Sequence, residues 1–317
     1  MTAALETRPA SAGRVGRPPE RPPRRKRKGR LTPYMLLAPT AVLIAVFLVY
    51  PVGSVFYYSL QKYNITQPYD NGFVGFDNFV KIWSDPTFWS SLRFTGQWVV
   101  VEVGLQLIFG LILALVVNET FKGRGIARAL SFAPWAVSGV LTTTLWLLIY
   151  NPISGFSKYF ADWGLVPYGT SILSSGDGAF WGAVIAELWK GIPFFAILIL
   201  ADLQSASPEL YEAAKVDGAN RVQRFFYVTL PHIKNAIILT TLLRAVWEFN
   251  NVDLLYTLTG GGPGGSTTTL PLYVADTAVD AKEFGYGSAL TVVAFFILLI
   301  FSAVYLLASR AGKDLEK

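Results

Sequence analysis

The sequence predicts an all-α, polytopic membrane protein with six transmembrane helices. Hydrophobic residues make up 52% of the 317 residues and charged residues only 15%, and the mean hydropathy is positive, a combination that is rare in soluble domains of this length. Six apolar runs are long enough to cross a hydrocarbon layer of about 30 Å, which takes roughly 20 residues. Because lipid offers the backbone no hydrogen-bond partners, we expect these runs to be helices.

The first of the six runs is longer than the core of a secretory signal. It also lacks a small-residue cleavage pattern followed by a soluble domain, so we expect it to be retained. The chain has no cysteine, which excludes disulfides, thiolate metal sites and cysteine catalysis. The predicted spans cover approximately residues 33–60, 94–117, 126–150, 179–203, 235–258 and 286–309.

The distribution of Lys and Arg predicts that both termini are cytoplasmic. Of the 27 cations, 20 fall in the alternate segments that include the two ends, five fall in the other segments, and Lys190 and Arg244 lie within spans. Cationic loops tend to stay in the cytoplasm. This places the loop 204–234 in the cytoplasm as well.

The predicted domains are a tail of residues 1–32, a six-helix domain of residues 33–310, and a short cytoplasmic tail of residues 311–317. The first tail is rich in Pro and Arg and has no apolar periodicity, so we expect it to be disordered. Such a basic run could bind nucleic acid. An anchor at lipid headgroups beside the first helix is the simpler interpretation.

The sequence of the loop 204–234 predicts a bent pair of short helices. Ser207 and Pro208 form an N-cap and first helical position, followed by acidic residues in the early turns. Gly218 follows an aspartate and suits a turn with positive φ. A second amphipathic helix then carries Phe225 and Phe226 toward the next span. Aromatic side chains at a membrane surface usually pack on something, which indicates a docking role for this loop.

The same loop, "EAAKVDGANRVQRFFYVTLP", resembles the EAA loop of importer-type ABC permeases, with Val228 where that family often has Ile. The resemblance implies a coupling helix that docks into a groove on a cytoplasmic ATPase subunit. It implies ATPase coupling for Glu212, Ala213, Ala214, Asp217, Gly218, Leu230 and Pro231.

Two further stretches resemble the maltose-type permeases of carbohydrate importers. They are "FVGFDNFVKIWSDPTFW", after the first span, and "LTGGGPGGST", before the last. With Trp189 and Pro193, the resemblance covers residues 34–310. It implies type I ABC importer architecture in a bacterial inner membrane. The implied partners are a second permease, an ATPase dimer that binds ATP and magnesium, an extracytoplasmic solute-binding protein and a sugar.

The Gly-rich loop has a competing interpretation as a phosphate cradle. A Walker A loop needs Lys and then Ser or Thr directly after its last Gly, but here Ser266 and Thr267 follow Gly265 with no Lys. The charge distribution also places this loop outside. We therefore expect a tight turn, a chain without an ATPase site or cofactor of its own, and energy from another subunit.

Two spans carry ionisable side chains that are costly in hydrocarbon and usually face a bundle interior or cavity. Each set follows i, i+3, i+4, i+7 spacing and so makes one stripe on its helix. The stripes predict a polar, aromatic-lined pocket for a hydroxyl-rich solute. A structural alternative pairs Glu187 with Lys190 and Arg244 with Glu248. The stripe residues are Glu187, Lys190, Gly191, Phe194, Arg244, Trp247, Glu248 and Asn251.

In maltose-type permeases the solute-contacting positions correspond to these eight residues. Several of them carry charge where the maltose pattern has neutral side chains, so a different disaccharide or a sugar derivative fits as well. Glu102 and Gln106 either line the path or form interhelical hydrogen bonds. His232, the only histidine, is expected to cap or pack at the end of the loop. No acidic or histidine cluster has metal-ligand spacing.

The predicted function is a permease subunit of an ATP-driven importer of a di- or oligosaccharide, working by alternating access. One alternative cargo is a phosphorylated polyol such as glycerol phosphate, for which Lys190 and Arg244 would bind the anion. An ion-coupled secondary transporter and a non-transporting membrane scaffold are alternatives from other classes.

Overall fold

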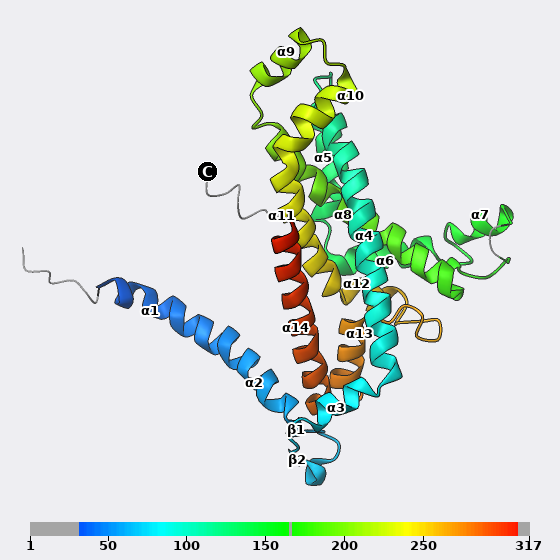
Figure 1. Ribbon diagram of the computed structural model, residues 1–317. Helices are drawn as coiled ribbons and strands as arrows, with labels where there is room; N and C mark the ends of the chain where they lie inside the picture. The colour runs from blue at the N-terminus through cyan, green and yellow to red at the C-terminus, as the bar shows by residue number, and fades with distance from the viewer. Residues whose placement is uncertain (1–31, 165–166, 310–317) are drawn as a thin grey trace, which may run out of the picture. The chain divides into compact units, whose positions relative to one another are not determined.

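The structure, a computed structural model, describes residues 32–164 and 167–309. The predictions for the two tails lie outside this range, apart from the helical residue Thr32. Two short strands, β1 (Gln61–Lys62) and β2 (Gly72–Phe73), form an antiparallel pair; every other element is helical (Figure 1). The α-helices are α1 (Thr32–Ile44), α2 (Tyr50–Ser59), α3 (Asp77–Trp83), α4 (Pro86–Asn118), α5 (Arg124–Ala136), α6 (Gly139–Ile149), α7 (Ser157–Asp162), α8 (Gly176–Leu203), α9 (Pro208–Val216), α10 (Arg221–Arg224), α11 (Leu230–Phe249), α12 (Asp253–Leu258), α13 (Leu270–Ala275) and α14 (Phe284–Ser309). The 3₁₀ and π segments are η1 (Ala45–Val49), η2 (Pro68–Asp70), η3 (Ile172–Ser174), η4 (Phe225–Thr229) and η5 (Asp276–Asp280).

Candidate membrane-spanning stretches account for most of the helical residues. Within the described residues five helical stretches are long and apolar enough to cross a bilayer, and a bent pair, α5 with α6, makes a sixth if it counts as one span. The all-α, polytopic prediction is therefore confirmed. The five are Tyr34–Ser59, Pro86–Asn118, Gly176–Leu203, Arg221–Phe249 and Phe284–Ser309.

The third predicted span is broken, which hydropathy alone did not indicate. The axes of α5 and α6 differ by 97°. Pro134 has no amide to continue the ladder, Val137 is extended, and the Ser138 hydroxyl accepts from the amide of Leu141 at 3.3 Å and starts a new helix. The run 126–150 is thus two helices meeting at a sharp corner.

The fifth span is displaced from its prediction at both ends. Helix continues without a break from α10 through η4 into α11, so the second amphipathic helix expected in the loop is the start of this span. At the other end α11 stops at Phe249, nine residues before the predicted limit. There the Asn250 side chain donates to the carbonyl of Val246 at 2.8 Å, and such local bonds compete with helix continuation. Leu254, Leu255 and Leu258 belong to the separate helix α12.

The described chain divides into two units, up to Pro51 and from Val52 onward. In the first unit every described side chain from Tyr34 to Pro51 is exposed. Its residues are almost entirely apolar, which suits a helix surrounded by lipid or by another membrane subunit. In the second unit α4, α8 and α11 lie against one another (Figure 1) and supply most of one apolar core.

A cluster of polar bonds ties the beginning of α4 to the last third of the chain. Asp85, the N-cap of α4, accepts hydrogen bonds from the hydroxyls of Tyr273 and Tyr286, both at 2.6 Å. The Thr95 hydroxyl accepts from the amide of Leu270 at 2.8 Å. Partial burial raises the pKa of Asp85, but the tyrosine and backbone hydrogen bonds outweigh it and leave that pKa below its usual value.

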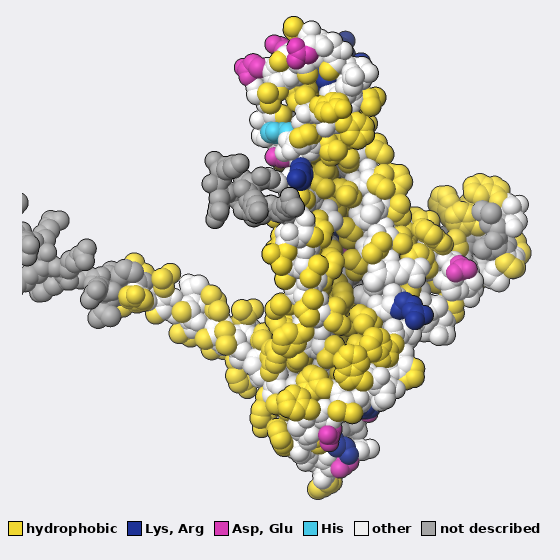
Figure 2. Space-filling model, in the orientation of Figure 1, with side chains coloured by type: hydrophobic (Ala, Val, Ile, Leu, Met, Phe, Trp, Pro, Cys, Tyr) yellow, Lys and Arg dark blue, Asp and Glu magenta, His cyan; other side chains and the backbone are white. Residues whose placement is uncertain are grey.

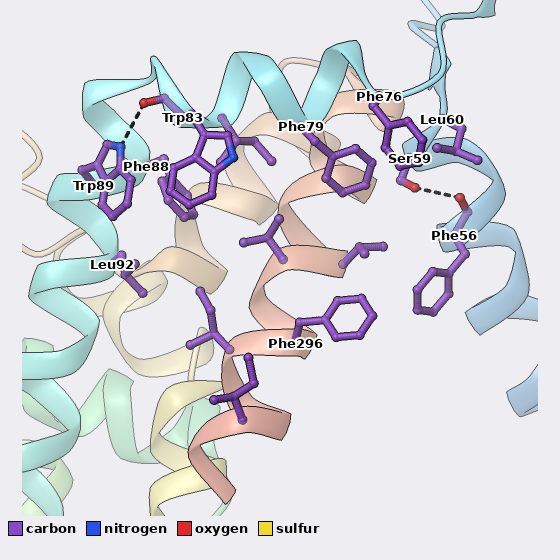
Figure 3. A pocket seen from close by; sticks show the side chains of 15 residues that line it. Phe56, Ser59, Leu60, Phe76, Phe79, Trp83, Phe88, Trp89, Leu92 and Phe296 are labelled. Atoms are coloured by element: carbon purple, nitrogen blue, oxygen red, sulfur yellow. Dashed lines mark hydrogen bonds between the residues drawn. The ribbon is translucent and has the colours of Figure 1, made fainter. Parts of the chain in front are cut away.

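A groove of about 740 Å³ lies between α2, α3, the beginning of α4 and α14 (Figure 3). Phenylalanine and tryptophan rings such as Phe79, Trp83 and Phe296 surround it. Ser59 is the one hydroxyl among its lining residues, and that hydroxyl donates to the carbonyl of Phe56 at 2.7 Å. The groove is therefore lined almost entirely by apolar side chains.

Candidate functional site

The intramembrane charges meet in one buried cluster, which we call the polar network: Glu102 and Gln106 on α4, Glu187 on α8, and Arg244 and Glu248 on α11. All five side chains are buried, with Arg244 the most exposed at 6%. Each lies on the face of its helix that packs on the other two. The network thus joins the three central helices at one depth.

Arg244 is the centre of the polar network. Its Nη2 lies 2.6 Å from Glu187 Oε1 and 2.6 Å from Glu248 Oε1, and its Nε donates to Gln106 Oε1 at 2.7 Å. The Gln106 amide nitrogen then donates to Glu102 Oε2 at 3.0 Å and to Glu248 Oε1 at 3.1 Å. One guanidinium therefore bridges all three helices through charge-assisted hydrogen bonds.

Two neighbours complete the polar network. The indole nitrogen of Trp98 and the amide nitrogen of Asn251 each donate to Glu248 Oε2 at 3.3 Å. Gly191 on α8 provides the space for Gln106, because a Cβ at this position would lie 2.3 Å from Gln106 Cδ. Any larger residue there would push the amide out of the network.

An aromatic pair borders the polar network on α8 and α11. The rings of Phe194 and Trp247 lie 5.1 Å apart at an interplanar angle of 43°, and the Arg244 guanidinium lies 5.7 Å from the Phe194 ring centre. Phe194 is buried, whereas Trp247 is 46% exposed. The indole is therefore the part of this region that another molecule can reach.

Lys190 lies on the other side of Glu187, beside a cavity of about 40 Å³. Glu187, Asn251, Asp253 and the buried Thr142 also line this cavity. The Lys190 ammonium comes within 3.5 Å of the position that a Cβ on Gly139 would take, and Asp253 Oδ2 within 3.8 Å of the same point. A cavity of this size has room for about one water molecule.

The structure thus brings all eight stripe residues into one region. Glu187, Gly191, Phe194, Arg244 and Glu248 are buried within it, while Lys190, Trp247 and Asn251 are at least partly exposed. Of the two ion pairs that the structural alternative predicted, Arg244 with Glu248 is formed. The predicted pair of Glu187 with Lys190 is not formed within 4 Å, because Glu187 pairs with Arg244 across the helices instead. Gln106 makes interhelical hydrogen bonds to Arg244 and Glu248, whereas Glu102 is bonded, among the described residues, only to Gln106 of its own helix. Their contact with a solute stays a prediction.

Sequence reasoning missed Trp98, Thr142 and Asp253. Trp98 stands one helical turn before Glu102, so its i, i+4 spacing could have revealed it. Thr142 and Asp253 had no such signal, because they reach this region from the bent third span and from α12, whose packing the sequence does not state. Among the described residues, no His, Cys, Asp or Glu group is arranged to hold a metal ion.

The second region is the coupling segment, residues 204–234. Ser207 is the N-cap residue of α9, as predicted, although its hydroxyl contacts the Glu209 carboxylate and not a backbone amide. Glu212, Ala213 and Ala214 lie on α9, and Asp217 caps its end. Gly218 has φ of +82°, the left-handed turn that the sequence predicted.

Large apolar side chains are exposed on the coupling segment. Val216 is 87% and Tyr227 81% exposed, and Leu210, Val222 and Phe226 are also exposed. In Figure 2 charged side chains gather at the α9–α10 end, while the helices beyond it present mostly hydrophobic ones. Exposed apolar side chains amid charge are typical of a surface that binds a partner.

Leu230 and Pro231 lie where the coupling segment enters α11. The proline ring would clash with the carbonyl four residues earlier in a regular helix. A π-turn relieves this, with the Leu230 amide bonded five residues back to the carbonyl of Phe225. His232 Nε2 lies 3.0 Å from Ser205 Oγ and 3.1 Å from the carbonyl of Asp202, so its predicted capping role is confirmed, at the end of α8.

Most of this chain, including the coupling segment, matches a known family. The family described as "Binding-protein-dependent transport system inner membrane component" matches residues 106–312. The chain belongs to this family. It is therefore a multi-pass inner-membrane permease of the ABC importer class, and the resemblance carried by its EAA-type loop is confirmed.

Individual relatives of this permease carry sugar names. The chain is 37% identical over 284 residues to a trehalose/maltose transport system permease protein of Thermococcus litoralis, covering 89% of this chain and 94% of the relative. It is 35% identical over 281 residues to a sulfoquinovosyl glycerol transport system permease protein of Agrobacterium fabrum, covering 87% and 90%.

Solved structures share the permease fold. One chain of a bacterial alginate ABC transporter, crystallised with an alginate pentasaccharide-bound periplasmic protein, matches with a TM-score of 0.75 and 21% identity. The match covers 88% of this chain and 94% of that one. At this identity the likeness establishes the ABC transporter permease fold alone.

Proposed function

We propose that this permease is one of two homologous membrane subunits of an ATP-driven importer for a neutral or derivatised di- or oligosaccharide. An extracytoplasmic binding protein delivers the sugar, and an ATPase dimer on the cytoplasmic side binds ATP and magnesium and supplies the energy. The family, the sugar names of the relatives and the polar, aromatic surface around Trp247 support this proposal. The charge distribution supports cytoplasmic termini and a cytoplasmic coupling segment.

The exposed half of the stripe is the proposed solute contact. Trp247 offers an indole face for the apolar side of a sugar ring, and Asn251 and Lys190 offer hydrogen-bond donors to hydroxyl groups. Glu187, Gly191, Phe194, Arg244 and Glu248 would position these residues or touch the solute after a rearrangement. Trp247 carries the proposal, because it is a large, half-exposed aromatic side chain directly beside a buried polar network.

The coupling segment is the proposed mechanical link. Its α9 helix and exposed apolar residues would dock on the ATPase subunit, with Glu212, Ala213 and Ala214 on the helix and Asp217 and Gly218 at its end. Closure of the ATPase dimer would move this segment as a rigid body and tip the two permeases from inward-facing to outward-facing. This chain would have no ATPase site of its own.

Uptake into proteoliposomes tests the solute contact. The complete importer is reconstituted with Trp247→Ala, and ATP-driven uptake of labelled trehalose and maltose is measured. We expect uptake at limiting sugar to fall about 3- to 10-fold, the value of one aromatic contact, with the same yield of assembled complex. Trp181→Ala is the matched control, because Trp181 is also about half exposed on α8 and contacts only the Phe180 ring among the described aromatic pairs. Equal affinity and rate in both variants would remove Trp247 from the solute path.

A further inference from the structure

We propose that the groove between α2, α3, α4 and α14 holds an acyl chain of an anionic phospholipid whose phosphate is bound by Arg93. The groove measures about 740 Å³ and lies within the second unit of the chain. The lipid would be a structural ligand of the permease. The proposal therefore goes beyond the transport function and does not depend on the identity of the cargo.

The walls of the groove suit hydrocarbon. The Ser59 hydroxyl donates to the carbonyl of Phe56 at 2.7 Å, and the Trp89 indole nitrogen donates to the carbonyl of Trp83 at 3.1 Å, so both of these polar groups are paired within the chain. The rest of the lining is aliphatic and aromatic. An empty space of this kind forfeits dispersion contacts, and hydrocarbon fills it without burying an unpaired polar group. Inside a bilayer the hydrocarbon at hand is an acyl chain.

The position of α3 favours a flexible chain over a transmembrane helix of another subunit. In Figure 3 α3 lies across one end of the groove, and the Phe79 and Trp83 side chains reach from it into the space beside α14. A spanning helix is about 30 Å long and would meet α3 before it reached that surface of the membrane. An acyl chain can enter from the side and needs no opening at that end.

Arg93 is placed to bind the phosphate of such a lipid. Trp89 lines the groove, and Arg93 follows it at i+4 on the same face of α4. The Arg93 side chain is exposed, and its residue lies about 10 Å along the helix from Pro86, inside the candidate span. An arginine at this depth directs its guanidinium toward the lipid headgroups. Guanidinium binds phosphate through two parallel hydrogen bonds.

The pairing of nearby charges leaves Arg93 available. Three cations lie in residues 61–93: Lys62 contacts Asp70, and the Lys81 ammonium lies 3.5 Å from a carboxylate oxygen of Glu283. Among the described residues, none of the ion pairs within 4 Å involves Arg93. One uncompensated positive charge beside the groove favours an anionic lipid such as phosphatidylglycerol over a zwitterionic one.

Photolabelling of the complete importer in phosphatidylcholine vesicles tests the acyl-chain step. The probe is phosphatidylglycerol with a diazirine in one acyl chain, and the labelled peptides are mapped by mass spectrometry. We expect adducts on the groove-lining parts of α3, α4 and α14. Adducts elsewhere on the importer with none in the groove would overturn the proposal, because protein would then cover this surface.

A variant that narrows the groove sharpens this test. Val293→Trp places a larger ring among the lining residues, and we expect it to lose the adducts on α3, counted relative to adducts elsewhere on the same protein. Val304→Trp is the control, because Val304 is exposed on α14 and does not line the groove. Adducts on α3 that persist in Val293→Trp would contradict the site. The wild-type map decides the acyl-chain step even if Val293→Trp assembles poorly.

The headgroup step is tested with phosphatidylglycerol and phosphatidylcholine probes that carry the same photoreactive chain. We expect phosphatidylglycerol to label the wild-type groove about fivefold more, the contribution of one cation near the membrane surface, and Arg93→Gln to label equally with both probes. Lys158→Gln, which removes an exposed cation of α7 outside the groove, should keep the fivefold ratio. Equal labelling of the wild type, or an unchanged ratio in Arg93→Gln, would overturn the phosphate contact. Sugar uptake is a separate measurement, so its failure would count against the proposed function and not against the lipid site.

Discussion

The polar network and the coupling segment differ in how their charged side chains are paired. In the polar network every charged side chain has a partner in the same chain, and Arg244 alone makes three such contacts. In the coupling segment Lys215 and Arg221 have no ion pair within 4 Å among the described residues, and apolar side chains such as Val216 stand in the open. The polar network meets nearly all of its hydrogen-bonding needs within this chain, with Glu102 Oε1 left without a partner among the described residues, whereas the proposed coupling role would make the other region one side of an interface.

The difference follows from the surroundings. An unpaired charge in hydrocarbon costs several kcal/mol, so the chain must satisfy Arg244 and its carboxylates internally. At an aqueous surface the same charges are solvated and a surface ion pair contributes little. The exposed charged and apolar side chains of the coupling segment are therefore available to bind the proposed partner protein. Mutations should affect folding in the first region and energy transfer in the second.

The largest effect is expected from Arg244→Ala. The change leaves Glu187 and Glu248 buried without their cation, which typically costs about 3–5 kcal/mol. We expect the variant to lose most of its membrane-inserted yield and to unfold at a clearly lower temperature in detergent. Arg221→Ala in the coupling segment is the matched control, because Arg221 is exposed, and it should keep its yield. Equal unfolding temperatures for the two variants would erase the contrast between the regions.

A smaller loss of stability is expected from Gly191→Ala. The new methyl group would lie 2.3 Å from Gln106 Cδ, and overpacking of this kind costs about 1–3 kcal/mol. Gly104→Ala is the control, because a Cβ at Gly104 meets nothing within 4 Å and alanine favours the helix. Thermal unfolding of the purified variants separates them: Gly191→Ala should fall and Gly104→Ala should hold or rise. A Gly191→Ala protein as stable as the wild type would show that the α4–α8 contact adapts.

The third variant, Gly218→Val, is expected to reduce sugar uptake with little effect on folding. Gly218→Val forces a β-branched residue into φ of +82°, which costs roughly 1–2 kcal/mol and distorts the turn after α9. We expect the assembled importer to keep hydrolysing ATP while sugar uptake per ATP falls about tenfold, equivalent to 1.4 kcal/mol of lost coupling. Gly218→Asn should retain more coupling because asparagine tolerates this conformation. Normal uptake by Gly218→Val would contradict the lever role of the segment.

Hydropathy and loop motifs were enough to predict much of the fold. The spans around α4, α8 and α14 are long apolar runs with polar ends. The turn at Gly218 was predictable because glycine readily adopts positive φ. The corner between α5 and α6 was missed, because a proline near a helix end is compatible with a continued span until the neighbouring packing is known. The early end of α11 was missed because Leu254, Leu255 and Leu258 continue the apolar pattern past Asn250.

The candidate site was predicted in its residues but not in its pairing. Spacing placed the charges on one face of each helix, which required only the helical period. The sequence does not state that α4 packs between α8 and α11, so Gln106 could not be identified as the residue that connects Arg244 to Glu102. The role of Gly191 could not be predicted either, because it depends on a contact with Gln106, which lies 85 positions earlier in the sequence.

The hydrogen bonds from Tyr273 and Tyr286 to Asp85 join residues 188 and 201 positions apart. During translation at about 5–20 residues per second, the start of α4 would wait roughly 10–40 seconds for these partners to be synthesised. Until then the nascent chain holds its second span without the contacts that fix its end. The contacts that fix the start of α4 therefore form only after α13 and the beginning of α14 have been synthesised.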